Sequence, residues 1–327
     1  MAGGSRQTHA ATLPASRFYC LLDELPLHLI PQRFRGLLHA CDKRNTDYRL
    51  NPNLVLTRDG EVPRDFASNP ALLSGFAMNG TIAWVPDANK QWLQPFWLGP
   101  ELDKLVSGMM AGGPPPSSLA DRALSLLTAA GIVRSLLEED RKNPAPETAA
   151  TLFQHKGYAP LADLIHPFHI AALRRYYRYL IRIGAIHLGD GQSSRRYVAY
   201  NEPVARFFHH QICATLSKVA GQQLIPSYVY MASYLEGAEL KKHTDRPQCE
   251  FSVTYCLDYS PEPSLESGWP IRLDTASGTV EVHQAIGDGL AYRGTRLPHY
   301  RDKLQEGKTS TSIFFHYVAL DFTGPLA

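Results

Sequence analysis

From residue 222 onward the sequence contains only short runs rich in β-branched and aromatic residues, separated by turns of Gly, Pro, Asp and Ser. The runs are SYVYMASY, EFSVTYCL, PIRLDT, TVEVHQAI, GLAYRG and STSIFFHYVAL. Their spacing suits an antiparallel barrel or sandwich. Two amphipathic segments precede them, ADLIHPFHIAALRRYYRYLIR and EPVARFFHHQICATLSKVAG, and the second ends at Gly221. Helices followed by a strand-only block predict an α+β fold, in which the helices brace one face of the sheet.

The first half of the chain has a different texture. The stretch EEDRKNPAPETAA (138–150) is typical of a linker, so we expect a disordered start at 1–15, an N-terminal α/β accessory or recognition domain at 16–148 and a second domain at 149–327. Within the first domain, NGTIAWVPDANKQWLQPFW predicts a hairpin. Two helices should follow, the second opening at Ser117 or Ser118 with Asp121 completing a capping box.

This strand-strand-helix-helix order resembles a winged helix-turn-helix unit, in particular the small peptide-recognition domains attached to enzymes that modify ribosomally made peptides. We therefore expect a mainly helical, winged-helix-like N-terminal domain. The alternative is that these elements only pack against the side of the second domain and have no recognition role.

Composition limits the partners. Of 327 residues, 33 are Lys or Arg and 31 are Asp or Glu, which leaves a net charge of +2 and no electrostatic argument for nucleic acid or a membrane surface. The five cysteines are scattered and odd in number, as expected for reduced thiols. The start lacks the pattern of a signal peptide, and no run of some eighteen apolar residues occurs. We expect a cytoplasmic protein without a membrane partner.

Within KKHTDRPQCE, His243 and Asp245 stand two residues apart. In a strand, residues i and i+2 point to the same side, so this pair would present an imidazole and a carboxylate together. The spacing alone is weak, but further β-rich runs, the turn GDGLAYRG and His299 in LPHYRD follow it. Two imidazoles and a carboxylate on one face of an octahedral ion leave three adjacent positions open, as in non-haem Fe(II) enzymes.

In these residues the sequence resembles the Fe(II)- and 2-oxoglutarate-dependent dioxygenases, nearest to the prolyl 4-hydroxylase-like branch, from about Phe153 to the end. The resemblance implies a double-stranded β-helix, that is, a jelly-roll or cupin-like barrel. It implies Fe(II) on His243, Asp245 and His299, with O₂ as co-substrate and ascorbate as the reductant in vitro. Lys308, nine positions after His299, and Ser310 would bind the far carboxylate of 2-oxoglutarate, and Tyr234 would contact the same co-substrate. Tyr234 could equally be a core aromatic residue.

Other histidines compete for the role of ligand. His283 is the better rival to His299, but it lies before the Gly-Asp-Gly turn and lacks a basic residue at the right distance. His316 shares a strand face with Lys308, but eight residues at about 3.3 Å each would place it far from that anchor, toward the other end of the barrel. The pairs 166/169 and 209/210 lie in helical stretches, where structural histidines are the ordinary expectation.

Four arginines surround the predicted site in sequence, at 246, 293, 296 and 301. We expect one of them to bind an acidic group of the substrate, either Arg246 beside the ligand pair or Arg293 on an inward strand. Most arginines in such loops merely face water.

The resemblance implies hydroxylation of an unactivated C–H bond in a peptide side chain or an amino-acid-like metabolite, with release of succinate and CO₂. Retention of Asp245 argues against halogenation, because halogenating relatives have a small residue there; desaturation and ring formation stay open. The alternatives are a non-enzymatic winged-helix regulator whose barrel senses a ligand or metal, and a metal-dependent isomerase or cupin-like hydrolase. The last would not explain Lys308 and Ser310.

Overall fold

The computed structural model describes residues 13–38, 48–87, 92–111, 121–135, 147–262 and 268–326. Its contacts divide the chain into two compact units, one of residues 1–25, 35–70 and 76–141 and one of residues 26–34, 71–75 and 142–327. In the described part of the chain, no helix has the length and apolar character needed to cross a membrane. The first twelve residues of the segment expected to be disordered, most of the predicted linker and the Ser117/Ser118 cap lie outside the described residues. The predicted domain boundary stays a prediction.

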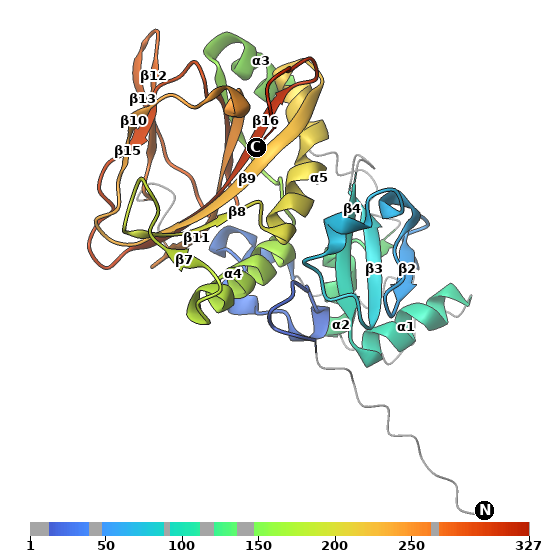
Figure 1. The fold of residues 1–327 in the computed structure, drawn as a ribbon. Coiled ribbons are helices and arrows are strands. Elements are labelled where there is room, and N and C mark those ends of the chain that lie inside the picture. Colours follow the sequence, from blue (N-terminus) through green and yellow to red (C-terminus); the bar gives the residue numbers. More distant parts are fainter. Residues whose placement is uncertain are drawn as a thin grey trace, which may run out of the picture. The chain divides into compact units, whose positions relative to one another are not determined.

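In its described residues the first unit contains two small antiparallel sheets and two α-helices (Figure 1). Its strands and helices are β1 (Tyr48–Leu50), β2 (Val55–Arg58), β3 (Thr81–Pro86), β4 (Leu93–Leu98), α1 (Pro100–Met110), α2 (Asp121–Ala129) and β5 (Val133–Ser135). Strands β2, β3 and β4 form one sheet, and β1 pairs with β5 in the other. Two buried tryptophans anchor the larger sheet: Trp84 Nε1 donates to Thr57 Oγ1 at 2.8 Å, and Trp97 Nε1 donates to the carbonyl of Ala77 at 2.6 Å.

The predicted strand-strand-helix-helix order is confirmed by β3, β4, α1 and α2. The prediction of a mainly helical unit is wrong for the described residues, because five strands accompany the two α-helices. Strands β1 and β5 are three residues each and pair across some eighty residues of sequence, so local patterns could not indicate them. The winged-helix resemblance stays a prediction.

The described part of the second unit consists of two facing antiparallel sheets and three α-helices (Figure 1). The larger sheet has seven strands in the order β6-β14-β11-β16-β9-β8-β7, and the smaller has four in the order β10-β15-β12-β13. The elements are α3 (Glu147–Lys156), β6 (Tyr158–Leu161), α4 (Pro167–Arg182), β7 (His187–Leu188), β8 (Arg196–Tyr200), α5 (Pro203–Ala220), β9 (Leu224–Tyr234), β10 (Leu240–His243), β11 (Phe251–Ser260), β12 (Ile271–Thr275), β13 (Gly278–Val282), β14 (Gly289–Arg293), β15 (His299–Arg301) and β16 (Thr309–Ala319).

From β10 onward the chain passes back and forth between these two sheets, which is jelly-roll connectivity. Helix α5 packs against β9 and α4 against β11, so the helices cover the outer face of the larger sheet (Figure 1). The predicted α+β arrangement of antiparallel sheets braced by helices is therefore confirmed for this unit.

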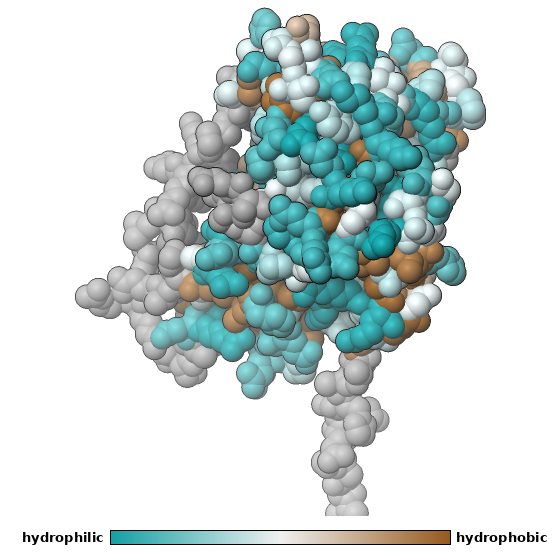
Figure 2. All heavy atoms as spheres, turned by 90° about the vertical axis from the view of Figure 1, so that its left-hand side faces the viewer, coloured by the Kyte–Doolittle hydropathy of each residue, from teal (hydrophilic) through white to brown (hydrophobic). Residues whose placement is uncertain are grey.

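Alternation along the smaller sheet separates its two faces. Ile271 and Leu273 of β12 are fully buried between the sheets, while Arg272 between them pairs with Glu281 on the outside at 2.8 Å. Lys242 and Asp274 form a second outer ion pair at 2.7 Å. Figure 2 shows that the face of the molecule on this side is largely hydrophilic. The smaller sheet therefore has one buried face, which is directed at the larger sheet.

Both predicted helices before the strand block are present, and they begin and end at recognisable caps. Pro167 and Pro203 occupy the first helical positions of α4 and α5. The carboxylate of Glu202 caps α5 by accepting from the backbone N–H of the next two non-proline residues, and it also accepts from Tyr177 Oη at 2.6 Å. Gly221 ends α5 at φ 71°, a left-handed conformation that glycine adopts without strain. Glu202 therefore links the two helices that support the larger sheet.

An ion triad, in which Arg174 and Asp258 are buried and Arg178 is exposed, joins α4 to the larger sheet. Asp258 on β11 accepts from Arg174 Nε at 2.9 Å and from Arg178 Nε at 2.6 Å. The Arg174 side chain is only 4% exposed and also donates to the carbonyl of Leu29. Removing Asp258 would take the nearest carboxylate from the buried guanidinium of Arg174, so this ion pair helps to hold α4 in a defined position.

His209 on α5 gives the fold a testable dependence on pH. Its Nε2–H donates to the carbonyl of His316 at 2.8 Å, and burial lowers its pKa from 6.5 to about 3. Because the folded pKa lies below the unfolded one, stability is complete above pH 6.5 and declines as the pH falls toward 3. At pH 4.5 this histidine should cost about 2–3 kcal/mol of unfolding free energy relative to pH 7.

Urea unfolding at pH 7 and 4.5 measures this effect. In the variant His209→Gln, which keeps an N–H donor but does not titrate, we expect the decline to be smaller by that amount. Equal declines in the two proteins would contradict the assignment.

Candidate metal centre

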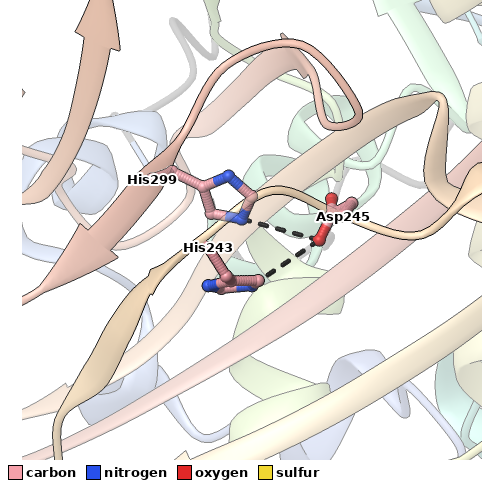
Figure 3. A group of neighbouring side chains, drawn as sticks. All are labelled: His243, Asp245 and His299. Carbon is pink, nitrogen blue, oxygen red and sulfur yellow. Dashed lines mark ion pairs between the residues drawn. The ribbon is translucent and has the colours of Figure 1, made fainter.

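Three residues predicted as metal ligands lie together where β10 and β15 pair (Figure 3). His243 is the last residue of β10 and lies directly opposite His299, the first residue of β15. Asp245 follows two residues later, and its backbone N–H donates to the carbonyl of Gly294 at 2.9 Å. Its Oδ1 lies 3.7 Å from Nε2 of His243 and 3.6 Å from Nε2 of His299. The structure therefore brings two imidazoles and one carboxylate to a common point.

Both imidazoles are oriented by their own backbone. His243 Nδ1 lies 2.7 Å from the carbonyl of Lys241, and His299 Nδ1 lies 3.0 Å from the carbonyl of Leu297. Since a carbonyl only accepts, each Nδ1 carries the proton and each Nε2 keeps its lone pair. Metal-binding histidines are usually oriented in this way. The two lone pairs are free to bind a cation beside Asp245 Oδ1.

Burial keeps one of these histidines neutral. His299 is 2% exposed, and burial lowers its pKa, although the neighbouring Asp245 carboxylate acts in the opposite direction. The neutral imidazole is the form that binds a metal ion. A cation at this point would also compensate the carboxylate of Asp245, whose side chain is only 11% exposed.

The second oxygen of Asp245 is held by Ser252, which is held in turn by His316, and the sequence indicated neither role. Ser252 Oγ on β11 lies 2.9 Å from Asp245 Oδ2 and 2.9 Å from His316 Nδ1 on β16. Because Ser252 has one hydroxyl hydrogen, it donates this to the carboxylate and accepts from His316. Burial lowers the pKa of His316 to about 4, so its imidazole stays neutral in this chain of hydrogen bonds. Ser252 and His316 thus fix the rotation of the Asp245 carboxylate.

His316, expected toward the end of the barrel away from Lys308, therefore lies beside Asp245. His316, Cys249 and Asp245 offer ligand-type atoms that all lie within 4.8 Å of one another. His316 is paired with Ser252 across β11 and β16, and this pairing over 64 residues of sequence brings it to Asp245. Strand geometry does separate His316 from Lys308, which directly precedes β16. The three candidate metal ligands, however, lie near the part of β16 that holds His316.

A cavity of about 480 Å³ opens beside the three ligands. It is lined by Asp190, Gln192, Arg196, Tyr200, Tyr228, Tyr230, Tyr234, Leu240, His243, Thr244, Asp245, Arg246, Cys249, Tyr292, His299, Phe314 and His316. Among the residues predicted to bind co-substrate or substrate, Tyr234 and Arg246 line it, whereas Lys308, Ser310 and Arg293 do not. The volume lies in the range of small-molecule sites.

The placement of Arg293 on an inward face needs correction. Its neighbour Tyr292 lines the cavity, and successive residues of a strand point to opposite faces. Arg293 instead packs its guanidinium over the rings of Phe153 and Phe251, with its Cζ 5.2 and 5.3 Å from their centroids. This position removes Arg293 from the cavity.

The rival histidine His283 also lies elsewhere. Its Nε2 is 2.9 Å from the carboxylate of Glu281, and it is not among the residues that line the cavity. Of the two arginines named beside Arg246 and Arg293, Arg301 is buried and donates to Gln284 Oε1 at 3.0 Å, and Arg296 does not line the cavity.

A cation that the sequence did not indicate lines the cavity on β8. The Arg196 side chain is 4% exposed and pairs with Asp190 Oδ2 at 2.5 Å. Its Nη1 donates to Tyr234 Oη at 3.3 Å, and its Nη2 to Gln192 Oε1 at 2.6 Å. Arg196, Tyr234 and Ser310 lie opposite one another on β8, β9 and β16, so they form one row across the larger sheet.

No family model and no curated protein matches the chain. Solved structures to which it is similar include a Pseudomonas putida prolyl-4-hydroxylase, with 16% identity over 54% of this chain and 100% of that one. A Burkholderia pseudomallei oxidoreductase of the 2OG-Fe(II) oxygenase family is 12% identical over 57% of this chain and 94% of that one. Streptomyces hygroscopicus HygX, solved with nickel, 2-oxoglutarate and hygromycin B bound, is 13% identical over 54% and 88%. The TM-score is 0.44 in each case, so the functional proposal rests on the side chains of the site.

Proposed function

We propose that this protein is an Fe(II)- and 2-oxoglutarate-dependent oxygenase that hydroxylates a C–H bond. The observation that carries the proposal is the convergence of His243 Nε2, His299 Nε2 and Asp245 Oδ1 beside a cavity. Two imidazoles and a carboxylate suit a first-row divalent ion, and three ligands on one side would leave the cavity side open to co-substrates. When bound, Fe(II) supplies the redox chemistry that couples decarboxylation of 2-oxoglutarate to oxidation of a substrate by O₂.

The residues of the chain have separate tasks in this reaction. His243 and His299 bind the ion through Nε2, because their Nδ1 atoms are committed to backbone carbonyls. Asp245 binds through Oδ1, while Ser252 keeps Oδ2 turned away. Positioning of this kind allows the ligands to hold one geometry while co-substrate and substrate enter.

For the far carboxylate of 2-oxoglutarate, the cavity favours Arg196 over Lys308. Arg196 and Tyr234 both line the cavity, and their side chains are hydrogen-bonded to each other. Asp190 occupies only part of the guanidinium, which has five N–H donors. Arg196 Nη1 and the Tyr234 hydroxyl can therefore bind one carboxylate together. Ser310 lies next in the same row and is buried.

A pair of variants separates these two cations. Loss of a charge-assisted hydrogen bond costs about 1.5–3 kcal/mol, so Arg196→Ala should raise KM for 2-oxoglutarate roughly 10- to 100-fold. Lys308→Ala should change it less than about 2-fold, because Lys308 lies outside the cavity. Initial rates of succinate formation at varied 2-oxoglutarate measure both constants. The opposite ranking would return the role to Lys308.

The function itself is tested by succinate formation from 2-oxoglutarate by purified protein with Fe(II), ascorbate and O₂. Slow turnover without substrate is expected for the wild type and none for His243→Ala. Anaerobic binding of 2-oxoglutarate to the metal-loaded protein is a second measurement, because turnover can be tightly coupled to substrate. If the protein binds metal but neither binds 2-oxoglutarate nor turns it over, the proposal is overturned. That outcome would favour the alternative of a non-enzymatic metal sensor.

A further inference from the structure

At the cavity, Arg246 directly follows the ligand Asp245 and is held in place by two tyrosines. Its Cζ lies 4.7 Å from the ring centroid of Tyr228, and its Nη2 donates to Tyr200 Oη at 3.3 Å. The two tyrosine rings are stacked, with centroids 5.0 Å apart and planes at 24°. A guanidinium fixed on aromatic faces in this way loses less conformational freedom when it binds an anion.

The charge of Arg246 is not balanced within the described residues. No carboxylate of the described chain lies within ion-pair distance of Arg246, whereas the other cavity cation, Arg196, is paired with Asp190. An exposed arginine usually needs no partner because water solvates it. Arg246 differs because it lines a concave site beside a metal ligand, where an incoming anion replaces that water.

We propose that Arg246 binds a carboxylate of the substrate, so that the substrate is a small carboxylic acid. This inference rests on the proposed function and names its substrate class. The volume of about 480 Å³ admits a small molecule. Because Arg246 and the three candidate ligands line the same cavity, an acid bound to Arg246 shares that cavity with the metal centre. Tyr200 and Tyr230 also line the cavity, so aromatic surface can contact the rest of the molecule.

The test uses protein loaded with Ni(II) and saturated with 2-oxoglutarate, so that added acids do not occupy the co-substrate site. A library of small carboxylic acids and their matched neutral amides is screened for an increase in Tm, and Kd is then determined for the compounds that bind. We expect acids to bind the wild type more tightly than their amides, and Arg246→Gln to weaken the acids by at least 10-fold while leaving the amides unchanged. Arg293→Gln is the matched control and should bind acids as the wild type does.

The proposal is overturned if no acid raises the Tm of the wild type more than that of Arg246→Gln, or if the amides bind as tightly as the acids. Acidic peptides form a separate arm, and preferential binding of peptides over small acids would also overturn it. Failure of the proposed function is distinguishable, because it would appear as absent binding and turnover of 2-oxoglutarate by the wild type before any acid is added.

Discussion

Replacement of His299 by alanine is expected to abolish succinate formation and to weaken divalent-metal binding by at least about 100-fold, since outer-shell changes alone cost 10- to 100-fold. His283→Ala, the matched control, should retain both properties. His299 presents Nε2 to Asp245 Oδ1 at 3.6 Å, whereas His283 pairs with Glu281 away from the cavity. Each variant removes one imidazole from the β-rich part of the chain. A difference between them in metal binding or succinate formation therefore reports the site and not the general loss of a histidine.

Equilibrium dialysis with Co(II) measures the metal affinity independently of turnover, and the succinate assay measures the reaction. Retention of metal by His299→Ala together with its loss in His283→Ala would identify the rival histidine as the ligand. If both variants keep the metal, neither histidine is a ligand and the candidate site is wrong. Circular dichroism of both variants tests whether the fold is intact.

Two of the three candidate metal ligands could be predicted from the sequence because the signal of the His243–Asp245 pair is local. A histidine and an aspartate two residues apart share a face of the chain, and a later histidine in a β-rich segment completes the set. The residues that orient Asp245 had no such signal. Ser252 and His316 meet through pairing of β11 with β16, and a serine or histidine on a strand is ordinary in composition.

The residues expected to bind 2-oxoglutarate and substrate show the same limit of local sequence patterns. Lys308 was predicted from a fixed spacing after His299, yet it does not line the cavity, and Arg196 on β8 does. Arg196 precedes the strand block in sequence and reaches the site because β8 pairs with β9 in the larger sheet. The face of Arg293 was also assigned incorrectly, because alternation fixes which residues share a face but not which face is inward.

Gly294 is the position where we expect the smallest substitution to have the largest effect. It follows β14, and its carbonyl accepts from the backbone N–H of Asp245. A Cβ added there would lie 2.3 Å from Asp245 Oδ2, 2.4 Å from the carbonyl of Cys249 and 2.9 Å from Ser252 Oγ. Since one of these contacts is backbone, a side-chain rotation cannot relieve the overlap, and Asp245 must move. Gly294→Ala should therefore lower the free energy of unfolding by about 1–3 kcal/mol and weaken metal binding at least 10-fold.

Gly108→Ala is the control for this variant, because Gly108 lies within α1 and an added Cβ would meet no heavy atom within 4 Å. A helical alanine should leave metal binding unchanged and stabilise the chain by about 0.5–1 kcal/mol. Urea unfolding and Co(II) affinity measure both variants. Unaltered metal affinity in Gly294→Ala would show that the orientation of the Asp245 carboxylate does not control the site, and the role assigned to Ser252 and His316 would fail with it.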